Sequence, residues 1–190
     1  SLETDQGKRA FIDFDGSMSR TTVYLNGKFV GEWPYGYSSF RLELTDHLLV
    51  GKENILAVRL DNKPDSSRWY PGGGIYRNVR LVKTAPVHLA HWATFVTTPG
   101  ATADGATVEI ETQIDGASEG VEVKHEITED GSDHVLATGE GTVCSIPIKS
   151  PRLWDLASPN LYTLKTSVIQ NGSLVDSEET TFGIRTIEYN

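Results

Sequence analysis

Apolar residues recur at every second position of this chain, in short stretches that turn residues separate. Residues 40–44, 108–114 and 121–127 each alternate apolar with polar side chains. A period of two places apolar side chains on one face of an extended strand, whereas a helix needs a period of 3.6. No stretch supports a helix longer than about two turns. The pattern therefore predicts an all-β protein.

The turn signals agree with this fold class. Asn26-Gly27 and Asn171-Gly172 each separate two apolar stretches. Asn-Gly favours a two-residue hairpin, because both central residues need positive φ. Residues 55–60 are apolar at nearly every position, which predicts a strand buried on both faces.

The chain divides near Thr84-Ala85-Pro86, where the strand pattern stops and then restarts. We expect one domain over residues 1–84 and a second over residues 85–190. The second contains about seven short strands at regular spacing, which is typical of an immunoglobulin-like sandwich.

Charge and composition exclude several functions. There are 17 Lys and Arg against 26 Asp and Glu, a formal net charge of −9. Because no basic cluster is present to neutralise phosphates, we expect no nucleic-acid partner. The sequence contains no apolar run of about 18 residues, the length that a membrane-spanning helix needs. The single cysteine, Cys144, cannot form an intrachain disulfide, and we interpret it as a small core residue.

Catalytic or metal-binding patterns are weak. His88 and His91 are three apart in a predicted strand, so they point to opposite faces and share a metal poorly. Asp13 and Asp15 could share a face, but Asp15 precedes Gly16 and is better interpreted as a turn residue. We assign no catalytic residue, metal or cofactor.

The most specific candidate for binding is the long connection from Asp61 to Gly74. It places Arg68, Trp69 and Tyr70 in succession. Loops of this length in compact domains are usually functional. Aromatic rings can stack on the C–H faces of sugars while the arginine binds hydroxyl groups. Alternatively, Trp69 and Tyr70 plug the sandwich or dock on a neighbouring domain. For a second aromatic cluster, residues 33–37, we favour a structural role.

Several motifs occur together in order. They are Val23 to Gly31 with Tyr35-Gly36-Tyr37, Asn54 to Asn62, Ser67 to Val79, Pro151-Arg152-Leu153-Trp154, Pro159-Asn160-Leu161-Tyr162 and Phe182-Gly183-Ile184-Arg185. Together they resemble glycoside hydrolase family 2, particularly its β-galactosidase-like members. The resemblance covers nearly the whole chain.

That resemblance implies a sugar-binding jelly roll lacking its first strands, followed by an immunoglobulin-like sandwich. A catalytic (β/α)₈ barrel would follow, so both catalytic glutamates lie outside the chain. The truncation leaves a sheet edge exposed. The implied substrate-binding residue is Ser67 or Arg68, with Asp65 a poorer choice. The loop as a whole, with Trp69 and Tyr70, is the predicted substrate contact.

The resemblance thus predicts an inactive fragment of a retaining β-galactosidase, whose partners are the carbohydrate substrate and the barrel. A free-standing carbohydrate-binding module and a purely structural sandwich pair remain open, as does homo-oligomerisation. The compartment is undetermined; a bacterial periplasm and a cytoplasm both fit.

Overall fold

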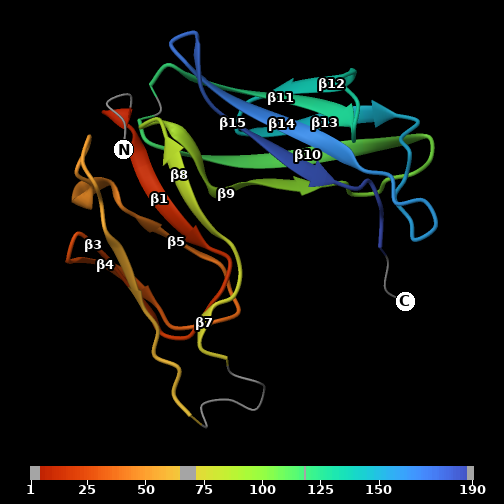
Figure 1. Ribbon diagram of the computed structural model, residues 1–190. Coiled ribbons are helices and arrows are strands. Elements are labelled where there is room, and N and C mark those ends of the chain that lie inside the picture. Colours follow the sequence, from red (N-terminus) through yellow and green to blue (C-terminus); the bar gives the residue numbers. More distant parts are fainter. Residues whose placement is uncertain (1–4, 65–71, 118, 188–190) are drawn as a thin grey trace. The chain divides into compact units, whose positions relative to one another are not determined.

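The protein is all-β in a computed structural model that describes residues 5–64, 72–117 and 119–187 (Figure 1). Every named element there is a strand except the short 3-10 helix η2 (Thr45–His47). Among the described residues, no helix is long and apolar enough to cross a membrane. The chain splits into two compact units, Ser1–Ala85 and Pro86–Asn190.

The first unit is a sandwich of short antiparallel strands. Its strands are β1 (Arg9–Phe14), β2 (Ser17–Met18), β3 (Thr21–Leu25), β4 (Lys28–Trp33), β5 (Phe40–Glu43), β6 (Leu56–Arg59), β7 (Gly74–Ile75) and β8 (Val79–Thr84). One sheet has the order β5-β1-β8 and another the order β4-β3-β6, while β2 pairs with β7. This is a jelly-roll sandwich in which neither three-stranded sheet closes on itself.

The core of this unit lies between its two larger sheets. Phe14 of β1 and Val23 of β3 are fully buried there. The ring of Phe14 stacks on that of Phe40 at 4.9 Å between centroids. The alternation predicted from the sequence therefore places one face of β1 and one face of β3 in contact with the core.

The predicted hairpin at Asn26-Gly27 is confirmed. Both residues have positive φ, 53° and 78°, and they join β3 to β4. The amide of Asn26 also donates to the carbonyl oxygen of His47 at 2.9 Å and accepts from the backbone of Ile55 at 3.0 Å. One side chain thus holds the hairpin, η2 and the start of β6 together.

The prediction that residues 55–60 are buried on both faces is wrong. Strand β6 is an edge strand with β3 as its neighbour, and Ile55 is 66% exposed. Apolar residues alone do not reveal how many strands flank a segment, so the sequence could not distinguish an apolar edge from a central strand.

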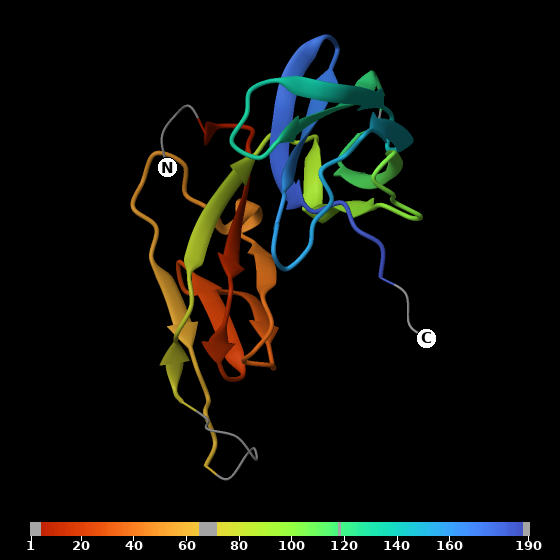
Figure 2. The same ribbon diagram turned by 90° about the vertical axis from the view of Figure 1, so that its right-hand side faces the viewer.

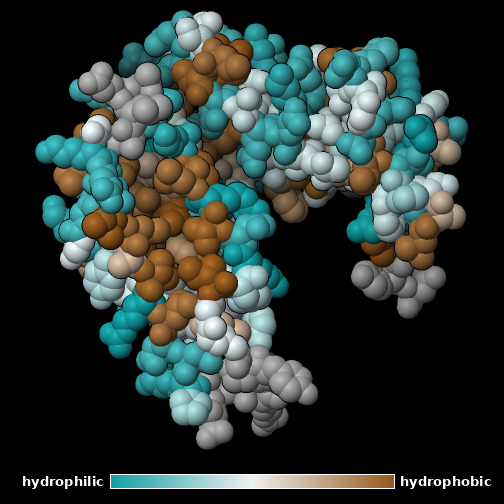
Figure 3. All heavy atoms as spheres, viewed as in Figure 1, coloured by the Kyte–Doolittle hydropathy of each residue, from teal (hydrophilic) through white to brown (hydrophobic). Residues whose placement is uncertain are grey.

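Strand β8, an edge strand of the other sheet, is also apolar and open to solvent. Leu81 pairs with Ile12 and so shares its core-facing side, yet Leu81 is 61% exposed. A groove of about 490 Å³ has Ile12, Leu25, Leu56 and Leu81 in its walls. Figure 3 shows apolar side chains gathered on this side of the first unit. The exposed sheet edge expected from the sequence is therefore apolar.

The second unit is an immunoglobulin-like sandwich of two antiparallel sheets. Its strands are β9 (His88–Thr97), β10 (Gly105–Asp115), β11 (Val121–Glu129), β12 (Val135–Glu140), β13 (Val143–Lys149), β14 (Tyr162–Gln170) and β15 (Ser173–Phe182). The sheet orders are β13-β10-β9 and β12-β11-β14-β15. Asn171 and Gly172 have positive φ, 50° and 79°, between β14 and β15, as the hairpin signal predicts.

Three of the sequence motifs meet at one end of this unit. The backbone N–H of Trp154 donates to the carbonyl of Ile184 at 2.9 Å, and Trp154 forms a bridge with Pro159. The guanidinium of Arg185 lies 4.6 Å from the Trp154 ring centroid. A Cβ at Gly183 would lie 3.0 Å from the Trp154 side chain. The glycine therefore allows this close approach without a shift of the Trp154 side chain.

Candidate functional site

One short segment, Ser17 to Ser19, holds both ends of the long connection between β6 and β7. On the return side, Ser17 pairs with Ile75 and Met18 with Gly74 in the β2–β7 ladder. On the outgoing side, the N–H of Asp61 donates to the carbonyl of Ser19 at 2.9 Å, and the Ser19 hydroxyl donates to the carbonyl of Asp61 at 3.2 Å. The connection therefore leaves and returns at one place.

The two described legs of this connection leave the same end of the first unit in Figures 1 and 2. The predicted binding residues Asp65, Ser67, Arg68, Trp69 and Tyr70 lie outside the described residues. The structure thus fixes the base from which the predicted loop starts, and the role of its tip stays a prediction.

The return leg is held by a tyrosine. The hydroxyl of Tyr76 donates to the carbonyl of Gly36 at 2.9 Å, and its ring meets that of Tyr37 edge-on at 6.4 Å. A Cβ at Gly16 would lie 2.9 Å from the Tyr76 ring, so Gly16 makes room for it. The next residue, Arg77, contacts the carbonyl of Asp15 at 3.4 Å.

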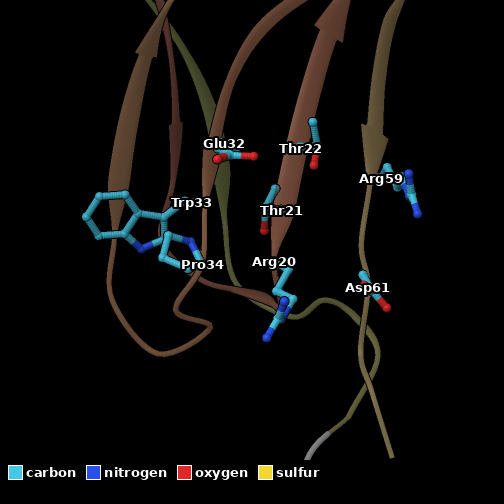
Figure 4. Close-up of a pocket in the computed structure, with 8 residues that line it drawn as sticks. All are labelled: Arg20, Thr21, Thr22, Glu32, Trp33, Pro34, Arg59 and Asp61. Atoms are coloured by element: carbon cyan, nitrogen blue, oxygen red, sulfur yellow. The ribbon is translucent and has the colours of Figure 1, made fainter. Parts of the chain in front are cut away.

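A polar pocket of about 510 Å³ lies beside the outgoing leg (Figure 4). The residues that line it are Arg20, Thr21, Thr22, Glu32, Trp33, Pro34, Arg59 and Asp61. Glu32, Thr22 and Arg59 form a row, because Thr22 pairs with Glu32 on one side and with Arg59 on the other. The row crosses β4, β3 and β6, as Figure 4 shows.

This pocket combines both signs of charge with one aromatic ring. Within the described part of the chain, no ion pair joins Arg20 or Arg59 to Glu32 or Asp61. Trp33 is held by stacking on Phe40 at 5.6 Å and by a hydrogen bond from its indole N–H to Ser38 Oγ at 3.0 Å. Donors, acceptors and an aromatic edge in one concave site suit a neutral polyhydroxylated ligand.

The sequence alone did not predict this pocket. Its polar members come from three strands, from Asp61 just after β6 and from Arg20, whose φ is 46°, and the strand register brings them together. The aromatic cluster at residues 33–37 gave a partial signal. Trp33 packs on the buried Phe40, and Gly36 lies so close to Met18 that a Cβ would collide with the Met18 sulfur.

The two carboxylates considered for catalysis are used in ion pairs. Asp13 makes a two-pronged pair with Arg41, at 2.6 and 2.8 Å, and Asp15 pairs with Arg80 at 2.7 Å. Paired in this way, both carboxylates hold neighbouring strands together.

The remaining titratable groups of interest lie in the second unit. His88 is 1% exposed, and its Nε2 lies 3.9 Å from Asp115. Cys144 packs against the core, and burial raises the pKa of its thiol. Among the described residues, no group of three His, Cys, Asp or Glu side chains could hold a metal ion.

Comparison with known proteins identifies the family of this chain. The model of the family described as "Glycosyl hydrolases family 2" matches residues 87–185, which is just over half of the chain. The chain therefore belongs to glycosyl hydrolase family 2, the family that its motifs resemble.

Individual relatives are named for different substrates. The chain is 39% identical to "Beta-galactosidase BoGH2A" of Bacteroides ovatus, over 97% of the chain and 23% of the relative. It is 38% identical to a "Putative beta-glucuronidase" of Formosa agariphila, over 96% of the chain and 18% of the relative.

A solved family 2 structure from Bacteroides cellulosilyticus aligns with a TM-score of 0.91 at 32% identity, over 98% of this chain and 26% of that one. The chain thus spans about a quarter or less of the length of these proteins.

Proposed function

We propose that this chain is the non-catalytic N-terminal part of a retaining β-galactosidase, and that its loop at residues 65–71 forms one wall of the substrate pocket. The observation that carries the proposal is the clamp at Ser17 to Ser19, which hydrogen-bonds both legs of the loop. A loop held at both ends loses less freedom on binding, which favours affinity.

Hydrolysis of a glycosidic bond with retention requires two carboxyl groups about 5–5.5 Å apart. We propose that both lie in a barrel domain outside these residues. In this arrangement, Ser67 or Arg68 binds substrate hydroxyl groups while Trp69 and Tyr70 supply an aromatic surface. The chain contributes binding and positioning, and proton transfer takes place elsewhere.

A neutral sugar is supported by the charge balance at the base of the loop. The pocket there contains two arginines, Arg20 and Arg59, and two carboxylates, Glu32 and Asp61. Their formal charges cancel, so the pocket has no net positive charge that would select the carboxylate of a glucuronide. A galactoside is uncharged, so it needs no oppositely charged group in the pocket to compensate it. One relative is named a β-galactosidase, and this supports the same substrate.

The experiment is an activity assay on the purified 190-residue chain with a nitrophenyl β-galactoside and the matching β-glucuronide. We expect no turnover above buffer with either substrate. Activity that copurifies with the chain would contradict the proposal. The gene provides an independent check, because a barrel of a few hundred residues should be encoded downstream of Asn190.

A free-standing carbohydrate-binding module is the second candidate, and the 510 Å³ pocket beside Trp33 favours it. Calorimetry of the 190-residue chain with galactosides separates the two. Binding that is lost in Trp69→Ala supports a module, whereas binding that Trp69→Ala leaves unchanged, or the absence of binding, supports a loop that acts only beside the barrel.

A further inference from the structure

Strand β9 of the second unit contains a large irregularity. Thr94 pairs with Thr112 of β10, and the next pair is Leu89 with Ile114. Four residues of β9, 90–93, therefore face one residue of β10, Gln113. A bulge of this kind re-aims side chains and is over-represented at sheet edges and next to active sites.

Trp92 lies within this bulge in an unfavourable backbone conformation. Its φ is 54°, in the left-handed region that is uncommon for bulky residues and costs about 1–3 kcal/mol. Its side chain is 70% exposed, so core packing does not offset the strain. Glycine would adopt this φ freely. A strained, exposed tryptophan suggests a role other than stability.

The indole is held in place although it faces solvent. The ring of His91 stacks on it at 4.3 Å between centroids, with 27° between the planes. Meanwhile Ala93, on the other side of Trp92, is 5% exposed and packs into a core cluster. The bulge therefore buries a small residue and presents a supported aromatic ring.

A second exposed ring follows on the same strand. Phe95 is 65% exposed, although residues three apart in a regular strand point to opposite faces. The bulge breaks this alternation, so both rings reach solvent. Phe95 pairs with Glu111, and Glu111 pairs with Val143, which is 74% exposed. This row crosses three strands on one face of the sheet.

Acceptor groups accompany the rings. Glu109 and Gln113 are two residues to either side of Glu111 on β10, so they share its face, and all three are exposed. A protein partner covering this face would have to remove water from carboxylates within an apolar row, which is costly. A neutral sugar can stack its C–H face on a ring while its hydroxyl groups donate to the carboxylates.

We propose that the β9 bulge forms a carbohydrate-binding surface, composed of Trp92, Phe95 and Glu111, for a neutral glycan chain. The carboxylates disfavour an anionic glycan. The surface is built only from residues of the second unit. The proposal holds whichever sugar the intact enzyme hydrolyses, because it concerns retention of a glycan and not its cleavage.

The test is affinity electrophoresis of the 190-residue chain in gels containing neutral β-1,4-galactan, with polygalacturonate as the anionic comparison. We expect galactan to retard the chain and polygalacturonate to leave its mobility unchanged. Trp92→Gly should weaken galactan binding by more than about tenfold, since a tryptophan that a ligand covers on binding often dominates the interface. Leu156→Ala, at a residue 93% exposed in the same unit, should have no effect.

Thermal unfolding provides the readout that separates binding from structure. Because glycine relieves the positive φ, Trp92→Gly should unfold at the same temperature as the unmodified chain or higher. A marked destabilisation would show that Trp92 serves the fold and would overturn the proposal. So would an absence of galactan binding, or self-association of the chain that Trp92→Gly abolishes.

Discussion

Replacing Gly16 by alanine should loosen the base of the long loop without unfolding the first unit. The new Cβ would lie 2.9 Å from Tyr76 Cζ and Oη, which is too close, so the ring must move. The ring is the far end of a side chain, so the backbone can stay in place. The movement breaks the hydrogen bond from Tyr76 to the carbonyl of Gly36.

The magnitude follows from the contacts that are lost. A hydrogen bond of this kind contributes about 0.5–1.5 kcal/mol to the free energy of unfolding, and the edge-on contact with Tyr37 about 0.5–1.5 kcal/mol more. Alanine restricts the unfolded chain and returns about 0.4–1 kcal/mol. We therefore expect a net loss of about 1–2 kcal/mol.

The assay is chemical unfolding of the wild type, Gly16→Ala, Tyr76→Phe and the double variant. Tyr76→Phe removes only the hydrogen bond and should cost about 1 kcal/mol. Both single variants lose this bond, so the double variant should be little less stable than Gly16→Ala alone. Strictly additive effects would refute the reasoning, because they would show that Gly16 and Tyr76 act independently.

Two further predictions concern the second unit. His125 is fully buried and hydrogen-bonded to Gly141 and Thr166, and burial lowers its pKa from 6.5. Since the unfolded chain binds the proton more readily, the stability that the neutral imidazole contributes is complete above about pH 6.5 and decreases as the pH falls below this value. His125→Gln should therefore flatten the pH dependence of thermal unfolding measured from pH 5 to 8. An unchanged slope would argue against this role of His125. Tyr162→Phe removes the oxygen that accepts from the backbone N–H of Arg152 at 2.8 Å, so unfolding in urea should show a loss of about 1–3 kcal/mol, whereas a neutral result would mean that water replaces the hydroxyl.

Local signals in the sequence predicted much of the fold. Period-two alternation identified the long strands of the second unit, such as β10 and β11, because each has one face in the core. The two Asn-Gly pairs marked hairpins because the turn itself demands positive φ. These features depend on neighbours along the chain, so one sequence suffices to predict them.

Features that depend on neighbours in space could not be predicted in this way. Residues 55–60 are apolar like a central strand, yet β6 has an open edge. The bulge at residues 90–93 exists only relative to β10, so the sequence indicated a plain strand there. The pocket around Arg20 and Asp61 likewise needs the pairing of β3 with β4 and β6.

The most direct test of the proposed role is the kinetics of Arg68→Ala in the intact family 2 enzyme that this chain is proposed to belong to. If the clamped loop supplies a charged hydrogen bond to the substrate, worth about 1.5–3 kcal/mol, kcat/KM for a nitrophenyl β-galactoside should fall by roughly 10- to 150-fold. A kcat/KM equal to that of the unmodified enzyme would contradict the account.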